Sequence, residues 1–201
     1  MTDGRLTQQI AFLVEADRLK SVNRRTPLVD GSRRENSAEH SWHLALAAMI
    51  LGEYAADRVD LLRVLELVTV HDLVEIDAGD AFAYDSAAQS AKTARELAAA
   101  DRLFGLLPAD QTAYVRGLWE EFEAQETMEA RVANALDRFQ PLLQNAHSGG
   151  GSWRTHDLTR ADVLRRMAPV EHAFPTLWPS VVGIIDSFCD LGVLRAVSGK
   201  P

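Results

Sequence analysis

One segment of this chain, residues 61–76, is apolar on nearly every side, and it constrains the fold more than any other part of the sequence. Nine of its sixteen residues are Leu or Val. A helix that is apolar all round has to be buried, so other elements must cover it from several directions. We therefore expect a central buried helix that ends near Gly79, because glycine readily adopts the conformation that closes a helix.

The rest of the sequence also favours helices. Ala and Leu dominate, runs of β-branched residues are short, and no alternation of apolar and polar residues persists. This pattern predicts an all-α fold. Asn36 or Ser37, followed by Glu39, is typical of a helix N-cap with a capping box. Helices are expected over residues 6–20, 37–57, 61–76, 86–104, 108–125, 128–144, 160–173 and 177–194. Residues 21–36 are expected to form an irregular connection, and the glycine-rich residues 147–157 a mobile loop.

Length, charge and cysteine content narrow the class of protein. The 201 residues favour one domain. Acidic residues outnumber basic ones by 29 to 21, and this net charge of −8 argues against binding to a nucleic acid polymer. An anionic small molecule remains compatible, because a few arginines can line one pocket. No apolar run is long enough to span a membrane. The one cysteine, Cys189, cannot form an internal disulfide, which suits a reducing cytoplasm.

The dipeptide His71–Asp72 lies near the end of the most apolar predicted helix. A charged carboxylate in such surroundings is costly unless something positive compensates it. Imidazole and carboxylate are both good ligands for a divalent cation. The dipeptide alone is a weak signal, because a second copy, His156–Asp157, lies in a polar segment. The apolar context of the first copy therefore indicates a metal site.

Two further residues could complete that site. His40 falls on the core-facing side of its predicted helix, and Asp137 lies in another helix beside Leu136. The simpler interpretations are a hydrogen-bonded core histidine and a paired carboxylate near the surface. Together with His71 and Asp72, these residues would form a four-ligand site of nitrogen and oxygen atoms, with room for water or substrate. Such ligands suit Mn, Co, Fe, Zn or Mg, and they do not choose among these metals.

The order His40, His71–Asp72, Asp137 resembles the HD-domain metal-dependent phosphohydrolase superfamily. Residues 33–40, RRENSAEH, are similar to the pattern R-x-E-N-x-x-E-H of its 5′-deoxynucleotidase branch, the relatives of the bacterial protein YfbR. Residues 71–75, HDLVE, followed by Gly79–Asp80, are similar to H-D-x-x-E and G-D. The resemblance covers about residues 10–145 and implies one helical domain over 1–201, with the helices of 158–194 packed on its core.

The resemblance implies one divalent cation and the release of phosphate from a (deoxy)nucleoside 5′-monophosphate. By position it implies these metal ligands: His40, His71, Asp72 and Asp137. It gives Glu75 an acid–base or water-positioning role, and Asp80 a contact with the substrate or the attacking water. Arg25 would bind phosphate, with Arg24 as the neighbouring alternative.

The residues themselves favour the same chemistry. On a helix, Glu75 would share one face with His71 and Asp72, where it could hydrogen-bond a metal-bound water. A cluster that includes Arg33 lies just before His40 and could form a phosphate-binding edge. Trp153 in the glycine-rich loop could close over a nucleotide.

Two alternatives stay open. The chain could be a non-catalytic nucleotide-binding module, although such a site has less need of both Glu75 and Asp80. It could also be a di-iron oxygenase of the HD type, which needs additional histidine ligands. We expect a small-molecule substrate and a homodimer, because residues 181–194 are apolar on more than one side.

Overall fold

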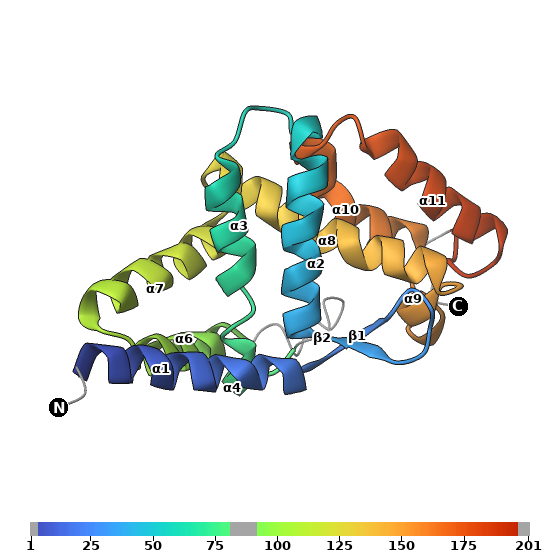
Figure 1. The fold of residues 1–201 in the computed structure, drawn as a ribbon. Helices are drawn as coiled ribbons and strands as arrows, with labels where there is room; N and C mark the ends of the chain where they lie inside the picture. Colours follow the sequence, from blue (N-terminus) through green and yellow to red (C-terminus); the bar gives the residue numbers. More distant parts are fainter. Residues whose placement is uncertain (1–3, 81–91, 197–201) are drawn as a thin grey trace.

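Most of the described residues lie in helices, and the only strands among them form one short hairpin, which confirms the all-α prediction (Figure 1). This computed structural model describes residues 4–80 and 92–196. Its elements, with η for 3₁₀ helices, are α1 (Gly4–Ala16), η1 (Asp17–Ser21), β1 (Asn23–Pro27), β2 (Arg34–Asn36), α2 (Ser37–Leu51), η2 (Gly52–Tyr54), α3 (Leu61–Val70), α4 (Glu75–Ala78), α6 (Lys92–Phe104), α7 (Ala109–Ala124), α8 (Met128–His147), α9 (Gly151–Thr155), α10 (Arg160–Ala173) and α11 (Trp178–Asp190). The predicted helix start at residue 86 lies outside the described residues.

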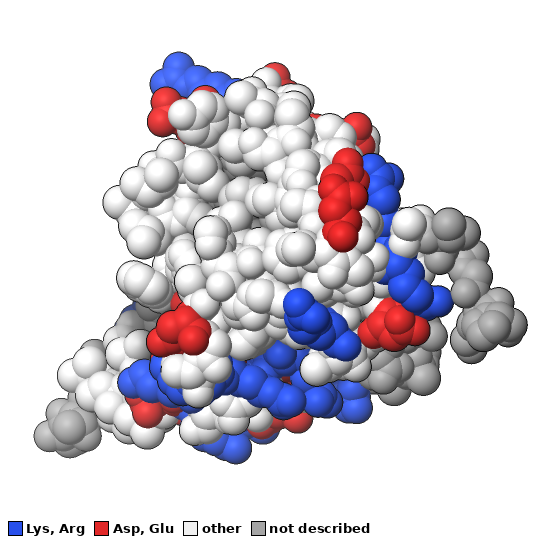
Figure 2. All heavy atoms as spheres, turned by 90° about the vertical axis from the view of Figure 1, so that its right-hand side faces the viewer, with Lys and Arg blue, Asp and Glu red and all other residues white. Residues whose placement is uncertain are grey.

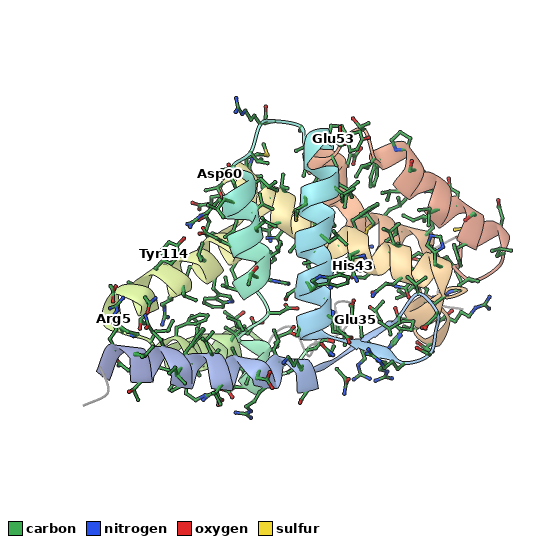
Figure 3. All side chains as sticks on the ribbon, viewed as in Figure 1. Arg5, Glu35, His43, Glu53, Asp60 and Tyr114 are labelled. Carbon is green, nitrogen blue, oxygen red and sulfur yellow. The ribbon has the colours of Figure 1, made fainter. Side chains whose placement is uncertain are left out.

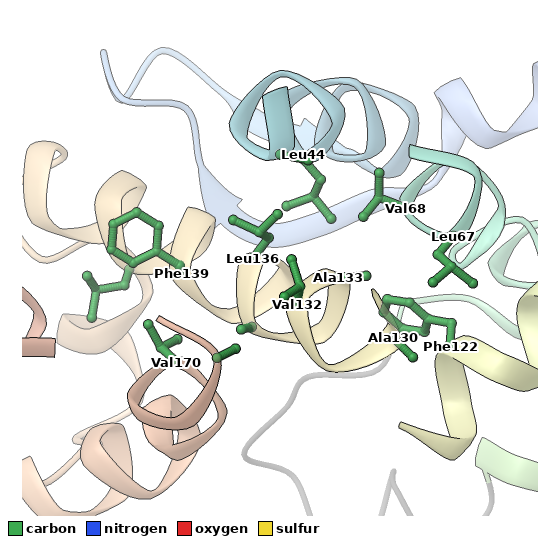
Figure 4. Close-up of a cluster of buried hydrophobic side chains, with 14 of the residues drawn as sticks. Leu44, Leu67, Val68, Phe122, Ala130, Val132, Ala133, Leu136, Phe139 and Val170 are labelled. Atoms are coloured by element: carbon green, nitrogen blue, oxygen red, sulfur yellow. The ribbon is translucent and has the colours of Figure 1, made fainter. Parts of the chain in front are cut away.

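Helix α8 lies at the centre and contacts α2, α3, α7 and α10 (Figure 1). Buried side chains from these five helices meet in one core: Leu44, Leu67, Phe122, Ala133, Leu136 and Val170 (Figure 4). Small residues such as Ala130 and Ala133 let the neighbouring helices approach α8 closely. The predicted central segment does contribute buried residues, but α8 is the helix that its neighbours cover from most sides.

The helix predicted over residues 61–76 is interrupted just at the proposed metal ligands. Helix α3 ends at Val70, a turn spans residues 71–74, and α4 begins at Glu75. In the turn, the Leu73 N–H donates to the Val70 carbonyl and the Glu75 N–H to the Asp72 carbonyl, a spacing of three residues in place of four. His71 still has a helical backbone and donates to the Leu67 carbonyl four residues back, so the tighter winding follows it. Gly79 closes α4 with a φ of 74°, as predicted.

The connection over residues 21–36 is more regular than expected. It contains an antiparallel hairpin, in which Asn23 pairs with Asn36 and Pro27 with Arg34. Its strands show no apolar alternation, and β1 instead gains its support from α8 and α9. The predicted capping box is confirmed, because the Asn36 side chain accepts from the Glu39 N–H and the Glu39 side chain accepts from the Asn36 N–H.

The C-terminal helices pack on the same core. Helix α10 lies against α8, and α11 lies against α10. The predicted loop over 147–157 contains the short helix α9, where Trp153 is buried and meets Phe188 edge-on, with ring centroids 5.3 Å apart. This packing, which sequence periodicity does not reveal, orders the glycine-rich segment. No helix in the described part of the chain is long and apolar enough to cross a membrane.

Candidate metal centre and substrate cavity

Three separate elements bring the four predicted metal ligands together. His40 comes from α2, His71 and Asp72 from the turn after α3, and Asp137 from α8. The His40 Nε2 lies 3.0 Å from the Asp137 Oδ1, and the His71 Nε2 lies 3.1 Å from the Asp72 Oδ1 and 3.9 Å from the Asp137 Oδ1. Ligand atoms of His40, His71 and Asp72 all lie within 4.8 Å of one another. This spacing allows His40, His71 and Asp72 to share one ion, and Asp137 lies beside the two histidines.

The hydrogen bonding of His71 prepares it to bind a cation. Its Nδ1 lies 2.9 Å from the Val68 carbonyl, which can only accept, so Nδ1 carries the proton. Nε2 then presents its lone pair to the cluster. This atom is buried and has no hydrogen-bond partner among the described residues. A buried lone pair that faces two carboxylates is unfavourable unless a cation lies between them. The residues present therefore fit a divalent metal.

A buried layer of polar side chains holds His40. Its Nδ1 lies 3.0 Å from the Gln140 Oε1, and the Gln140 amide donates to the Glu35 carboxylate at 2.7 Å. The Gln144 amide donates to the same Glu35 oxygen, and Gln140 also donates to the His43 Nδ1. Figure 3 labels Glu35 and His43 beside α2. Such outer contacts fix the ring orientation of a metal-binding histidine. The sequence analysis predicted no role for Gln140 or Gln144. They lie four residues apart on one face of α8, and this helical spacing is the pattern from which a shared role could have been predicted.

The electrostatics of the cluster favour added positive charge. Burial and Arg24 act to lower the pKa of His40, but hydrogen bonds to Asp137 and Glu35 outweigh them and raise it to about 9. Burial alone would raise the pKa of Asp137, but the hydrogen bond to His40 and the charges of Arg166 and Arg138 hold it well below its usual range. A metal ion could therefore replace the proton that His40 attracts.

Glu75, at the start of α4, is buried beside the cluster. The Ser37 hydroxyl donates to the Glu75 Oε2 at 2.7 Å and fixes the carboxyl group. Burial, followed by the charge of Asp72, raises the pKa of Glu75 to about 8. The carboxyl group therefore holds a proton near neutral pH, which suits an acid–base role. Asp80 lines the same cavity, just after α4.

The predicted phosphate-binding arginines have different positions. Arg24 is half-buried and donates to the Asp72 Oδ2 at 2.7 Å, while Arg25 is exposed and lines the cavity. Arg33 does not reach the cavity, because its guanidinium forms hydrogen bonds to both carboxylate oxygens of Glu39, at 2.8 and 2.6 Å. The hairpin turn directs Arg33 to the outer side of α2. The expectation that Arg33 contacts substrate therefore has no support in the structure, and Arg24 is the cationic side chain closest to the candidate ligands.

A cavity of about 390 Å³ opens beside the cluster. His71, Asp72, Glu75 and Asp137 line one part of it. The remaining lining includes apolar side chains and arginines: Phe122, Leu142, Trp153, Met167, Arg138 and Arg166. In Figure 2, basic side chains gather along the lower edge of the face shown, at the level of the β1–β2 hairpin in Figure 1. Trp153 lines this cavity from a buried position in α9, so the structure gives it a fixed place rather than a mobile one.

Histidines that could serve a second ion are not near the cluster within the described ranges. His43 accepts from Gln140, and the remaining three, His147, His156 and His172, are exposed. The second His–Asp copy, at 156–157, is exposed too, as expected for a solvated pair. This arrangement gives no support to the di-iron alternative.

Comparison with known proteins places the chain in a family. A model of the HD domain matches residues 16–178. The human 5′-deoxynucleotidase HDDC2 is 33% identical over 112 residues, which are 56% of this chain and 53% of the human protein, so the chain spans about half the length of that relative. The 5′-deoxynucleotidase hdd1 of Schizosaccharomyces pombe is 25% identical over 140 residues, 67% of this chain and 69% of that protein. A crystal structure described as a predicted metal-dependent phosphohydrolase from Magnetospirillum magnetotacticum MS-1 is 48% identical with a TM-score of 0.91, over 96% of this chain and 97% of that chain. This chain therefore belongs to the HD domain family.

Proposed function

We propose that this chain is a divalent-metal-dependent phosphohydrolase that releases phosphate from (deoxy)nucleoside 5′-monophosphates. The observation that carries the proposal is the buried, unpartnered Nε2 of His71, which faces the carboxylates of Asp72 and Asp137 beside a cavity lined by arginines. The descriptions of the relatives, a metal-dependent phosphohydrolase and two 5′-deoxynucleotidases, support the reaction and the class of substrate.

The metal would be held by the Nε2 atoms of His40 and His71 and by the carboxylates of Asp72 and Asp137. Nitrogen and oxygen ligands without a thiolate suit Mn, Co, Fe, Zn or Mg. When bound, such an ion lowers the pKa of a coordinated water and supplies a hydroxide nucleophile near neutral pH. The hydrogen bond from His71 to the Val68 carbonyl and the contact of His40 with Gln140 keep both imidazoles in the required tautomer.

The chain's own acid–base group would be Glu75. Because burial and Asp72 keep its carboxyl protonated near neutral pH, it can donate a proton to the leaving nucleoside oxygen or exchange one with water in the cavity. Asp80, four residues after Ile76, would contact the substrate or the attacking water from the same wall. Arg24 and Arg25 would orient the phosphate by charge-assisted hydrogen bonds.

The dimensions of the cavity support a nucleotide substrate. Its volume of about 390 Å³ falls in the range of small-molecule sites. Phe122, Trp153 and Met167 provide apolar surface for a sugar or base, and Phe122 lies beside the charged wall, with its ring centroid 4.7 Å from that of His71. We expect the phosphate to lie at the charged wall and the nucleoside to lie against these three side chains.

A phosphate-release screen tests the proposal. Nucleoside 5′-monophosphates and their deoxy forms are offered with each of several divalent metals, and the matching 3′-monophosphates serve as the substrate control. Asp72→Ala should lose both bound metal and activity while its helical circular dichroism is retained. The matched control is Asp157→Ala, which alters the solvated second His–Asp copy and should behave as the unaltered protein. Full turnover by Asp72→Ala, or nucleotide binding without phosphate release under every metal, would contradict the proposal and favour a binding-only module.

A further inference from the structure

Two arginines that have no role in the chemistry above face the cavity from the C-terminal helices. Arg138 lies on α8 and Arg166 on α10, and both line the cavity. The Arg138 Nη1 lies 3.3 Å from the Asp137 Oδ2, and the Arg166 Nη2 lies 3.7 Å from the same oxygen. Two guanidinium groups thus converge on one carboxylate oxygen. Arg166 also lies beyond residue 145, outside the segment in which the sequence motifs occur.

The closest hydrogen-bond partners of Arg138 are neutral oxygens, and its contact with the Asp137 carboxylate is longer. The Arg138 side chain is 15% exposed, and its shorter hydrogen bonds, both 3.0 Å long, go to the neutral backbone and side-chain oxygens of Asn134. Asp137 is also shared, because its Oδ1 faces the two histidines. An anion in the cavity would compensate both arginines.

The geometry identifies the kind of anion. Arg24 approaches the Asp137 Oδ1 at 3.9 Å, while Arg138 and Arg166 approach Oδ2, so guanidinium groups reach the candidate metal site from both oxygens of one carboxylate. Arginine forks bind groups with several oxygen atoms in fixed directions, and a phosphate monoester offers three of them with a double negative charge. A phosphodiester has only two unesterified oxygens and a single charge, so it could form fewer of these contacts.

We propose that Arg138 and Arg166 form a binding site for the terminal phosphate of the substrate, which makes them determinants of the preference for dianionic phosphate monoesters. This inference rests on the proposed function for the identity of the substrate, but the anion site itself can be measured without turnover. Arg138 and Arg166 touch the phosphate oxygens, and Arg24 contacts them from the other side of Asp137.

Binding of inorganic phosphate to the metal-loaded protein, measured by calorimetry, is the first test. Arg138→Gln and Arg166→Gln should each weaken phosphate binding by about tenfold to a hundredfold, the loss typical of a hydrogen bond between charged groups. Arg165→Gln is the matched control on α10, because its side chain is 75% exposed and pairs only with Asp162 among the contacts described. Arg131→Gln is the corresponding control on α8, two turns before Arg138. Both controls should bind phosphate as the unaltered protein does.

Further measurements separate this role from a structural one. If the two arginines only neutralised Asp137, their loss would change metal affinity and leave phosphate affinity intact, and that result would overturn the inference. Arg138→Lys and Arg166→Lys keep the charge without the fork and should restore part of the phosphate affinity, which also covers the case in which Arg138→Gln fails to fold. With an active nucleotide, KM should rise in step with the phosphate dissociation constant. If the unaltered protein binds phosphate but has no nucleotidase activity, and the arginine variants lose this binding, the result would support the anion site and refute the proposed function.

Discussion

At the scale of single residues, the buried contacts of Gln140 link the fold to the candidate metal. This amide meets His40 on one side and donates to Glu35 on the other. Its replacement in Gln140→Met would leave the buried Nδ1–H of His40 with only a longer contact, 3.5 Å to the Glu35 Oε2. We expect metal affinity to fall about tenfold to a hundredfold, as is usual when an outer contact of a ligand is lost. The free energy of unfolding should fall by about 1–3 kcal/mol.

Titration calorimetry with the metal and thermal unfolding of the metal-free protein check both effects. Gln144→Met is the matched control, because Gln144 donates to the same Glu35 oxygen and has no hydrogen bond to His40. This control should lower stability and keep metal affinity. Unchanged metal affinity in Gln140→Met would show that the contact does not orient His40.

Glu75 should leave a distinct mark on the pH dependence of stability. Because its pKa rises from the ordinary range near 4.5 to about 8 on folding, the folded protein holds a proton that the unfolded chain releases between these values. The unfolded state then binds fewer protons, so this residue makes stability fall as pH rises from about 5 to 8. Glu75→Gln removes this contribution. Chemical unfolding of the metal-free protein at several pH values should show a shallower decline in the variant, and an identical slope would contradict it.

The same variant addresses catalysis. Gln keeps the shape and can still accept from Ser37, but it cannot hold a transferable proton. Activity in Glu75→Gln should fall by about 10²- to 10⁴-fold. Bound metal, counted by elemental analysis, should stay at the level of the unaltered protein. A simultaneous loss of metal would instead make Glu75 a ligand.

At the scale of elements, the sequence predicted the features that depend on residues close together in the chain. The N-cap of α2 and the bounds of α10 depend on residues close together in the chain, and both agree with prediction. Contacts between distant parts of the chain stabilise the other two elements. The β1–β2 hairpin contacts α8, and α9 contacts β1 and Phe188, so no local sequence pattern predicts them. The break after Val70 could not be predicted either, because a run of apolar residues is compatible both with a continuous helix and with a tight turn.

The site follows the same division. His40, His71, Asp72 and Asp137 could be proposed because each stands out as a polar residue in apolar surroundings or in a motif. Arg138 and Arg166 belong to no recognised motif, and only the packing of α10 on α8 brings them to one carboxylate. Arg33 was proposed from its place in a motif, which does not reveal that its guanidinium pairs with Glu39.

The N-cap of α2 gives an element-scale prediction. Asn36 satisfies the N–H of Glu39, one of the donors that a helix start leaves without a partner. Asn36→Ala should lower the free energy of unfolding by about 0.5–2 kcal/mol, while Asn36→Asp should keep most of it. Denaturant unfolding measures both. Equal stability of Asn36→Ala and the unaltered protein would mean that the hairpin alone fixes the start of α2.

At the scale of the whole molecule, the residues expected to favour a homodimer bury their apolar side within the chain. Val181, Ile185 and Phe188 of α11 belong to the core, and the exposed positions between them include Gly183 and Ser187. Helix α11 therefore no longer supports self-association. Large apolar side chains do lie open on α1 and on α2. On α2 four of them are exposed by 41–66%: Trp42, Leu46, Met49 and Ile50.

The outer face of α2, defined by these four side chains, is suited to a second copy of itself. A helix that is apolar on both its inner and its outer face is normally covered on both. Leu46 lies midway between Glu39 and Glu53, seven residues from each, and Glu39 is already paired with Arg33. An antiparallel pairing about Leu46 would bring Glu53 of one copy toward the Arg33 end of the other, as a two-fold interface requires. We therefore expect a dimer through α2.

Leu46→Glu places two like charges at the centre of that interface and should convert the dimer into a monomer, because a buried unpaired carboxylate is unfavourable. Sedimentation velocity over a range of protein concentrations measures the change. Leu191→Glu is the matched control, since Leu191 is an equally large exposed side chain located after α11 and should leave the assembly intact. Because the candidate metal ligand His40 points to the opposite, buried face of α2, metal binding should survive in the monomer. A monomeric unaltered protein, or a dimer that persists in Leu46→Glu, would contradict this pairing.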